Sequence, residues 1–174
     1  MKFLWIWALT TITALLLSTV TNAQEIIFDA GAIEGNVSFP SSEEGNIAIL
    51  SFDFGVGQKP TNQAGVTSAT QCQYDEVVLA KGLDNASPEL IKAAALGSRL
   101  GNTSISVYAP MPTGELLEVL QLTFLDTVVL SSDISVNDQG GLPSEVVTLG
   151  FSDVRGTVTD PVSRIFEEFE ITCF

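Results

Sequence analysis

The sequence predicts a mainly β protein, a barrel or a sandwich, that carries one short helix. Three observations predict this fold class. Short segments rich in Val, Ile, Leu and Phe recur along the chain, and clusters of Gly, Pro, Asn and Asp separate them. Beyond the N-terminus, only residues 87–97 combine helix-forming residues with signals for both helix ends. No internal repeat or linker divides the chain, so we expect the strands to share a single core.

The N-terminal segment, residues 1–23, has the layout of a secretory signal peptide. Lys2 precedes an apolar run over residues 3–17, and small residues stand at the end of the segment. Cleavage after Ala23 would release residues 24–174 to the periplasm or the cell exterior. The alternative is an uncleaved membrane anchor, for which the apolar run is short.

The composition is strongly acidic. The chain has 21 acidic and 7 basic residues, a net charge of −14, and cleavage after Ala23 would remove one more basic residue. Such a surface repels nucleic acid and anionic membranes, so we expect neither as a partner of the mature chain.

The chain contains no histidine. This composition excludes Ser-His and Cys-His nucleophilic sites, histidine general bases and most zinc sites. No nucleophile and base pair is visible in the sequence, so a hydrolase is disfavoured, and we assign no catalytic residue, no metal site and no cofactor.

The first half of the mature chain is predicted to contain three strands. Residues 25–33 form the first and residues 46–55 the second. Residues 58–69 are polar and contain Pro and Gly, which predicts a loop long enough to be mobile. Residues 70–79 form the third strand, which leads to the helix.

In the second strand, side chains are expected to alternate between two faces. This alternation places Asp53 on the same face as Ile47 and Ile49. The neighbours of Asp53, Phe52 and Phe54, fall on the opposite face.

The helix is predicted from its end signals. Ser87 has the chemistry of an N-cap, because its hydroxyl can accept a hydrogen bond from a free amide of the first turn. Pro88 follows at the first helical position, where a missing N–H costs nothing. Gly97 can adopt the left-handed conformation that ends a helix.

The second half is again predicted to be β. Residues 104–108 form a strand, residues 115–131 form two strands or one long bent strand, and residues 145–159 form another. Pro161 ends that segment. The C-terminal extension, residues 161–174, is expected to add an edge strand or a contact arm between subunits.

The two cysteines, Cys72 and Cys173, are expected to pair. In an oxidising compartment they would form one disulfide closing a loop of about 100 residues. That bond would pin the tail to the barrel. Two free thiols and a bridge between subunits remain alternatives, because spacing alone does not settle pairing.

Four sequence blocks, in this order and spacing, resemble the Hcp tube proteins of type VI secretion systems. The resemblance covers residues 26–160. The blocks are IFDAGAIEG followed by NIAILSFDFG, then Lys81-x-x-Asp84-x-x-Ser87-Pro88, then LEVLQLTFLDTVVLSS, and finally LPSEVVTLGFSDVRGTV.

The resemblance implies a compact β-barrel of two antiparallel sheets with one short α-helix at its side, over residues 24–160. It also implies a structural subunit without enzymatic activity that assembles into hexameric rings and stacked tubes. Partners would be other copies of the chain, small effector proteins and other secretion-system components. The segment Phe52-Asp53-Phe54 takes the place of a Trp-Ser-Trp in the family, whose central residue faces the lumen. Asp53 is therefore either a lumen residue or an ordinary exposed strand residue.

The predicted signal peptide departs from the family, whose members normally leave through the secretion machine itself. The chain is thus either a ring-forming protein that reaches the periplasm or exterior by general export, or a monomeric secreted β-domain that binds carbohydrate or another surface ligand. The mass of the assembled protein separates these two functions.

Overall fold

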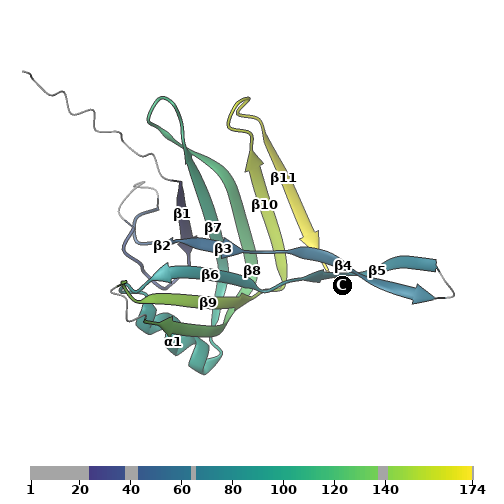
Figure 1. Ribbon diagram of the computed structural model, residues 1–174, viewed down its shortest axis with the longest axis horizontal. Helices are drawn as coiled ribbons and strands as arrows, with labels where there is room; N and C mark the ends of the chain where they lie inside the picture. The colour runs from purple at the N-terminus through teal and green to yellow at the C-terminus, as the bar shows by residue number, and fades with distance from the viewer. Residues whose placement is uncertain (1–23, 38–42, 64–65, 137–140, 174) are drawn as a thin grey trace, which may run out of the picture.

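The computed structural model describes residues 24–37, 43–63, 66–136 and 141–173 (Figure 1). The predicted signal peptide, residues 1–23, lies outside the described residues. The elements are β1 (Glu25–Asp29), β2 (Ile47–Ile49), β3 (Ser51–Asp53), β4 (Val56–Gln63), β5 (Val66–Tyr74), β6 (Val77–Gly82), α1 (Ser87–Leu96), β7 (Arg99–Pro110), β8 (Leu116–Ser135), β9 (Ser144–Gly150), β10 (Asp153–Thr159) and β11 (Phe166–Thr172).

The main sheet folds on itself as a barrel. Its strands pair antiparallel in the order β2-β1-β7-β8-β9-β6-β3, and β2 and β3 are consecutive in the chain, so the path returns to its start. The long strand β8 connects the two sides of the barrel. Its first half pairs with β7 and β10, and its second half pairs with β9. The predicted mainly β fold of two antiparallel sheets with one short helix is confirmed, the second sheet being the β4–β5 hairpin.

The predicted strand over residues 46–55 is wrong in one respect, because it is broken at Leu50. Ile47 and Ile49 are buried in β2, which pairs with β1, whereas β3 pairs with β6. The Leu50 N–H donates to the carbonyl oxygen of Ala80 at 2.7 Å, which transfers the chain from one partner to the other. The inward alternation shifts by one residue at this corner, so Asp53 faces away from the core.

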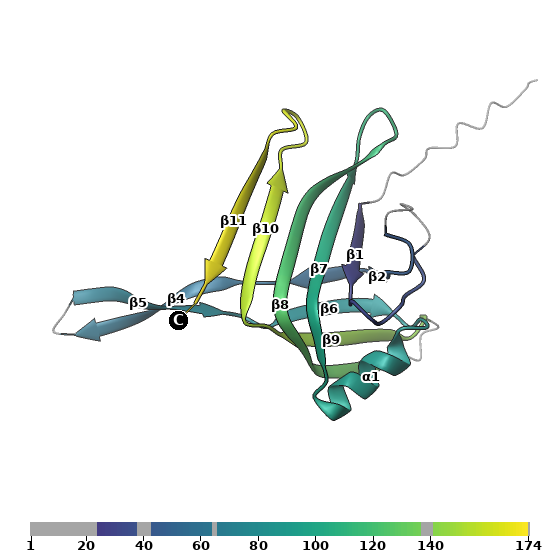
Figure 2. The same ribbon diagram turned by 180° about the vertical axis from the view of Figure 1, so that it is seen from behind.

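The predicted mobile loop over residues 58–69 is also wrong. This segment belongs to the β4–β5 hairpin, which pairs from Val56 opposite Tyr74 to Gln63 opposite Val66. The hairpin projects from the barrel (Figures 1 and 2). The register of the hairpin shifts between Lys59 and Pro60, and proline is usual at such irregularities.

Two other predicted strands are interrupted at corners of the barrel. The one over residues 70–79 stops at Tyr74 and resumes at Val77. The one over residues 145–159 is divided into β9 and β10 by Phe151 and Ser152. In contrast, the segment predicted over residues 115–131 lies, from Leu116 on, in the single strand β8, one of the two predicted alternatives.

The C-terminal extension forms an edge strand. β11 pairs antiparallel with β10 over seven residue pairs, from Asp153 opposite Thr172 to Thr159 opposite Phe166. The turn between them is held by Asp160, whose carboxylate accepts the Val162 N–H at 2.9 Å and the Ser163 hydroxyl at 2.7 Å. These hydrogen bonds lower the pKa of Asp160.

The core fills the space between the barrel strands and α1. The helix contributes Ala86, Leu90 and Ala93, which pack with buried side chains that include Phe28, Ile47, Leu79, Ile105, Phe124 and Leu149. A smaller cluster lies under the loop after β1 and consists of Ile27, Val37 and Tyr108. In the described part of the chain, no helix is long and apolar enough to cross a membrane.

Candidate functional site

The outward face of strands β3, β6 and β9 carries Asp53. This residue lies opposite Val78 on β6, and Val78 lies opposite Thr148 on β9. The next row of the same face is Ser51, Ala80 and Val146. The Asp53 face, as we call these six residues, is therefore made of small side chains around one exposed carboxylate.

The aromatic neighbours of Asp53 point the other way. Phe52 and Phe54 are half-buried and pack on the main core. The Phe54 ring meets Phe124 edge to face with centroids 5.5 Å apart, and Phe151 lies 5.9 Å away. Because the pleat sends alternate residues to opposite faces, this packing fixes the outward direction of Asp53.

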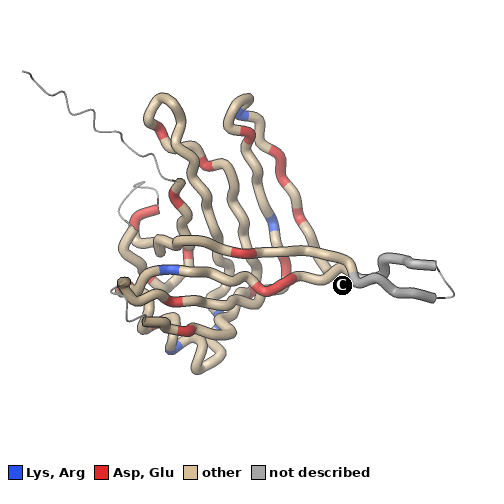
Figure 3. The backbone as a smooth tube through the Cα atoms, viewed as in Figure 1, with Lys and Arg blue, Asp and Glu red and all other residues tan. Residues whose placement is uncertain are grey.

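Acidic residues are spread over the whole barrel and the β10–β11 hairpin, and they outnumber the basic ones (Figure 3). Among the residues that the structure describes, no group of three or more His, Cys, Asp and Glu side chains is placed to hold a metal ion.

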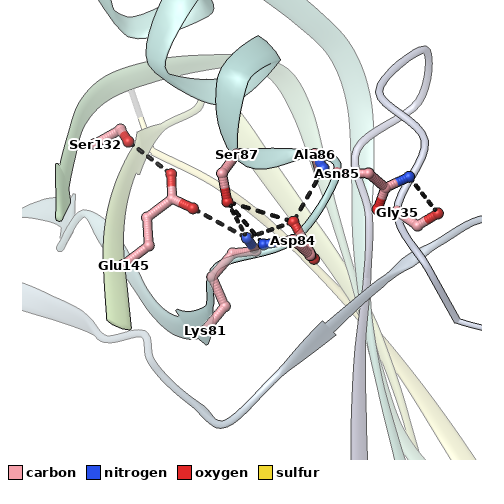
Figure 4. A network of polar contacts seen from close by, with 8 residues as sticks. All are labelled: Gly35, Lys81, Asp84, Asn85, Ala86, Ser87, Ser132 and Glu145. Atoms are coloured by element: carbon pink, nitrogen blue, oxygen red, sulfur yellow. Dashed lines mark hydrogen bonds and ion pairs between the residues drawn. The ribbon is translucent and has the colours of Figure 1, made fainter. Parts of the chain in front are cut away.

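A buried ionic network joins α1 to the barrel (Figure 4). The side chains of Lys81 on β6 and Glu145 on β9 are both 0% exposed, and their charged atoms are 3.0 Å apart. The Lys81 ammonium also donates to Asp84 at 2.7 Å and to the Ser87 hydroxyl at 2.9 Å. The second oxygen of Glu145 accepts the Ser132 hydroxyl at 2.7 Å.

This network sets the start of the helix and corrects the predicted cap. The helix begins at Ser87, its N-cap is Ala86, and no side chain caps it. The Ser87 hydroxyl is engaged elsewhere, because it accepts the Asp84 N–H at 3.2 Å as well as the Lys81 ammonium. Pro88 falls at the second helical position, one later than predicted, where its missing N–H still costs no intrahelical bond. Gly97 ends the helix with φ of 60°, as predicted.

The role of this ionic network is structural. Every buried side-chain nitrogen and oxygen in the described part of the chain has a hydrogen-bond partner. A buried cation shared by two carboxylates and a hydroxyl is satisfied where it stands, so the cluster positions α1 against the barrel.

In the sequence, Lys81 and Asp84 stand out only as part of a block that resembles the family, and Glu145 was not predicted as part of a site. Strand alternation could have found the pair. Val77, Leu79 and Lys81 share one face of β6, and Glu145 shares its face of β9 with two buried apolar residues. A lone cation and a lone carboxylate at such positions indicate a buried ion pair.

A second junction connects the hairpin to the C-terminus. Cys72 on β5 and Cys173 after β11 form a disulfide, so the bond joins the tail to the base of the hairpin. Next to it, the Tyr74 hydroxyl donates to the carbonyl oxygen of Ile171 and accepts the Cys173 N–H at 3.1 Å. The Tyr74 ring lies 4.9 Å from that of Phe151.

Tyr74 was not singled out by the sequence. Burial raises its pKa and the nearby Asp153 carboxylate adds to the rise, whereas the hydrogen bond from the Cys173 N–H works in the opposite direction. The available signal was its place two residues after Cys72 on the same strand, and hence on the same face.

Comparisons with known proteins agree with this architecture. A family model described as "Type VI secretion system effector, Hcp" matches residues 24–157. β11 lies beyond the matched residues. No curated protein sequence matches the chain.

Solved structures with the same fold include the following three. Hcp1 from Salmonella typhimurium aligns with a TM-score of 0.72 at 24% identity, covering 86% of this chain and 95% of that one. A type VI secretion system effector from Yersinia pestis aligns with a TM-score of 0.64 at 20% identity, covering 84% and 99%. The secreted protein Hcp3 from Pseudomonas aeruginosa aligns with a TM-score of 0.60 at 16% identity, covering 85% and 98%. At these identities the likeness shows the fold.

Proposed function

The chain belongs to the Hcp family of type VI secretion system proteins, and we propose that it is a structural subunit that assembles into six-membered rings and stacked tubes. The observation that carries this proposal is the family match over residues 24–157, which spans the barrel from β1 into β10. We also propose that the chain has no catalytic activity. The ionic cluster of the barrel is buried, and all its buried side-chain nitrogen and oxygen atoms already have hydrogen-bond partners within the protein.

The free strand edges of the molecule support self-assembly. β4 and β5 pair only with each other among the described residues, and β11 pairs only with β10. Backbone N–H and C=O groups along such edges can pair with another chain. Two different surfaces that meet head to tail generate a ring when the rotation closes.

The test of assembly is the mass of residues 24–174 in solution. Light scattering at several concentrations should give six times the mass of one chain, or larger multiples of that value. A monomer at every concentration would overturn the ring and favour a secreted binding domain.

Within such a ring, we infer that the Asp53 face lines the bore. Its small side chains leave space in the centre, and Phe52 and Phe54 hold Asp53 toward that space. Each subunit would then add one carboxylate to the wall. An effector protein carried in the lumen would lie against this ring of charge.

The lumen position is tested by chemical access. In an Asp53→Cys variant, assembled tubes should react with a small maleimide and only slowly with a maleimide on a large polymer. Glu34→Cys, at an exposed position in the loop after β1, is the matched control and should react with both. Equal reaction of the Asp53→Cys tubes with both reagents would place this residue outside the bore.

Effector carriage has a separate test. Asp53→Ser removes the carboxylate while keeping a small side chain. If Asp53 contacts cargo, this variant should retain less of a co-expressed effector than the Glu34→Gln control does. Unchanged retention would count against a cargo role for Asp53.

We also propose that residues 1–23 act as a cleaved signal peptide and deliver the chain to the periplasm or the exterior. The apolar segment supports this route, and the Cys72–Cys173 disulfide fits an oxidising compartment. Mass spectrometry of the protein from cells should find Gln24 at the N-terminus. Intact residues 1–23 in a membrane fraction would contradict cleavage.

A further inference from the structure

We propose that the Cys72–Cys173 disulfide is a redox latch that fixes the direction of the β4–β5 hairpin, so that rings stack only after the chain is oxidised. This inference rests on the proposed function, because stacking presupposes rings. It adds a condition on assembly, and it assigns Cys72, Tyr74 and Cys173 as positioning residues for the hairpin.

The hairpin is attached to the body at one end. Two short connections join it to the barrel, residues 54–55 before β4 and residues 75–76 after β5. The Asp75 N–H donates to the carbonyl oxygen of Gly55 at 2.9 Å, which bridges these connections. In the described part of the chain, neither hairpin strand pairs with the main sheet.

The other links at the base lead mostly to the last residues of β11. The disulfide and the two hydrogen bonds of Tyr74 all end at Ile171 or Cys173. That end of the chain is a firm anchor, because β11 is paired with β10 along its whole length. Residues 171–173 therefore tie the base of the hairpin to β11 (Figure 2), and we call them the strap.

A strap at the base controls the position of the tip. The hairpin extends roughly 20 Å beyond Cys72, from six residues at about 3.3 Å each. The tip lies about 30 Å from the two short connections, because β5 has nine residues at about 3.3 Å each. A rotation of about 10° at these connections would therefore move the tip by about 5 Å, which is one strand spacing. A hairpin that swings this far cannot hold one register against a neighbouring subunit.

The redox step is ordinary thiol–disulfide exchange. One cysteine thiolate attacks a disulfide-bearing oxidant, either a small-molecule disulfide or a thiol–disulfide oxidoreductase, and displaces one of its sulfurs. The second cysteine then attacks the mixed disulfide and releases the other sulfur. Two electrons pass from the cysteines to the oxidant, and the two thiol protons end on its released thiols. Both cysteines are half-buried, so neither residue lies in the closed core.

The test compares the exported protein before and after reduction with dithiothreitol, by hydrogen exchange and by light scattering. Reduction should raise the exchange rate of the amides of residues 56–58 and 72–74 about tenfold and leave β6 and β9 unchanged. The stacked fraction should fall several-fold. A Cys72→Ser/Cys173→Ser variant should match the reduced protein and show no response to dithiothreitol, which controls for effects of the reagent.

The outcomes separate the two proposals. Rings that stack equally in both redox states, with unchanged hairpin exchange, overturn the latch and leave the ring intact. A chain that forms no ring in either state overturns the proposed function and with it the link to stacking. Reduction of the folded wild-type protein gives the comparison even if the double variant fails to fold.

Discussion

Two junctions attach elements to the barrel, and they are built in opposite ways. The helix α1 is joined through Lys81, Glu145 and Asp84, which are buried and share charge at 2.7 to 3.0 Å. The hairpin is joined through the Cys72–Cys173 bond and the hydroxyl of Tyr74, at half-buried positions.

The difference indicates that the α1 junction belongs to the fold and the hairpin junction to the assembly. Opening the α1 junction would leave charges in an apolar interior without a partner, so this junction belongs to the permanent fold. Opening the hairpin junction leaves two thiols and a hydroxyl near water, and it leaves no buried charge without a partner. Only the second junction is suited to change state.

The largest effect is expected from Lys81→Met. The variant keeps the length of the side chain but leaves Glu145 and Asp84 without their cation. Removing one partner of a buried ion pair costs about 3–5 kcal/mol of the free energy of unfolding. Urea denaturation of wild-type and variant proteins measures the loss.

The matched control is Lys92→Met on the same helix. Lys92 forms an exposed pair with Glu89 at 3.4 Å, and such pairs contribute at most about 0.5 kcal/mol. Equal losses in the two variants would contradict the assignment of the Lys81 network as the fixed junction. Adding Glu145→Met to Lys81→Met should recover part of the loss, since one unpaired carboxylate is removed.

The next effect is expected from Cys72→Ser/Cys173→Ser. The bond closes a sequence separation of 101 residues, and loss of a disulfide costs about 2–4 kcal/mol, mainly by freeing the unfolded chain. Reductant should lower the stability of the wild-type protein to that of the variant. A wild-type protein whose stability ignores reductant would show that the cysteines are not bonded in solution.

A smaller effect is expected from Gly156→Ala on β10. A Cβ at this position would clash with the Phe169 ring of β11, so the ring that covers the glycine must move. Overpacking of this kind costs about 1–3 kcal/mol. It should weaken the anchor of the strap, seen as faster hydrogen exchange in β11.

Phe169→Leu provides the compensating change. Its shorter side chain leaves room for the new methyl group, so the double variant should be less destabilised than the two single changes added together. Strict additivity would show that the ring and Gly156 do not interact.

The smallest effect is expected from Tyr74→Phe. Loss of the hydroxyl removes its hydrogen bonds to Ile171 and Cys173, which contribute about 0.5–1.5 kcal/mol. Thermal unfolding of the oxidised protein measures the loss. A stability equal to wild type would show that the disulfide alone holds the strap.

The difference in stability between the wild-type protein and Tyr74→Phe should also depend on pH. Burial raises the pKa of Tyr74 in the folded protein. Its contribution to stability is therefore fully present below about pH 10, the pKa of tyrosine in the unfolded chain. That contribution is lost as the pH rises above this value. Tyr108, whose pKa is also raised by burial and by Glu43, is present in both proteins. The stability gap between wild type and Tyr74→Phe should therefore narrow above about pH 10.

Several elements were predictable from sequence. The helix was marked by Pro88 and Gly97 at its ends, β8 by its long apolar segment, and the edge strand β11 by its place after Pro161. The break at Leu50 was not predictable, because it depends on which strand is the partner on either side of it.

The β4–β5 hairpin and the start of α1 are two further features that the sequence did not predict. Residues 58–69 read as a loop because their sequence is polar, contains Pro and Gly, and lacks the apolar alternation that marks a strand. Ser87 carried the signature of an N-cap, yet Lys81 and Asp84 take its hydroxyl. The cysteine pair was predictable, whereas its attachment to the hairpin required the strand register.

Negative-stain electron microscopy of the oxidised protein, residues 24–174, tests the ring directly. We expect six-fold end-on views with an open bore, and side views of stacked rings. Uniform single particles of the size of one barrel, at every concentration used for light scattering, would contradict the ring.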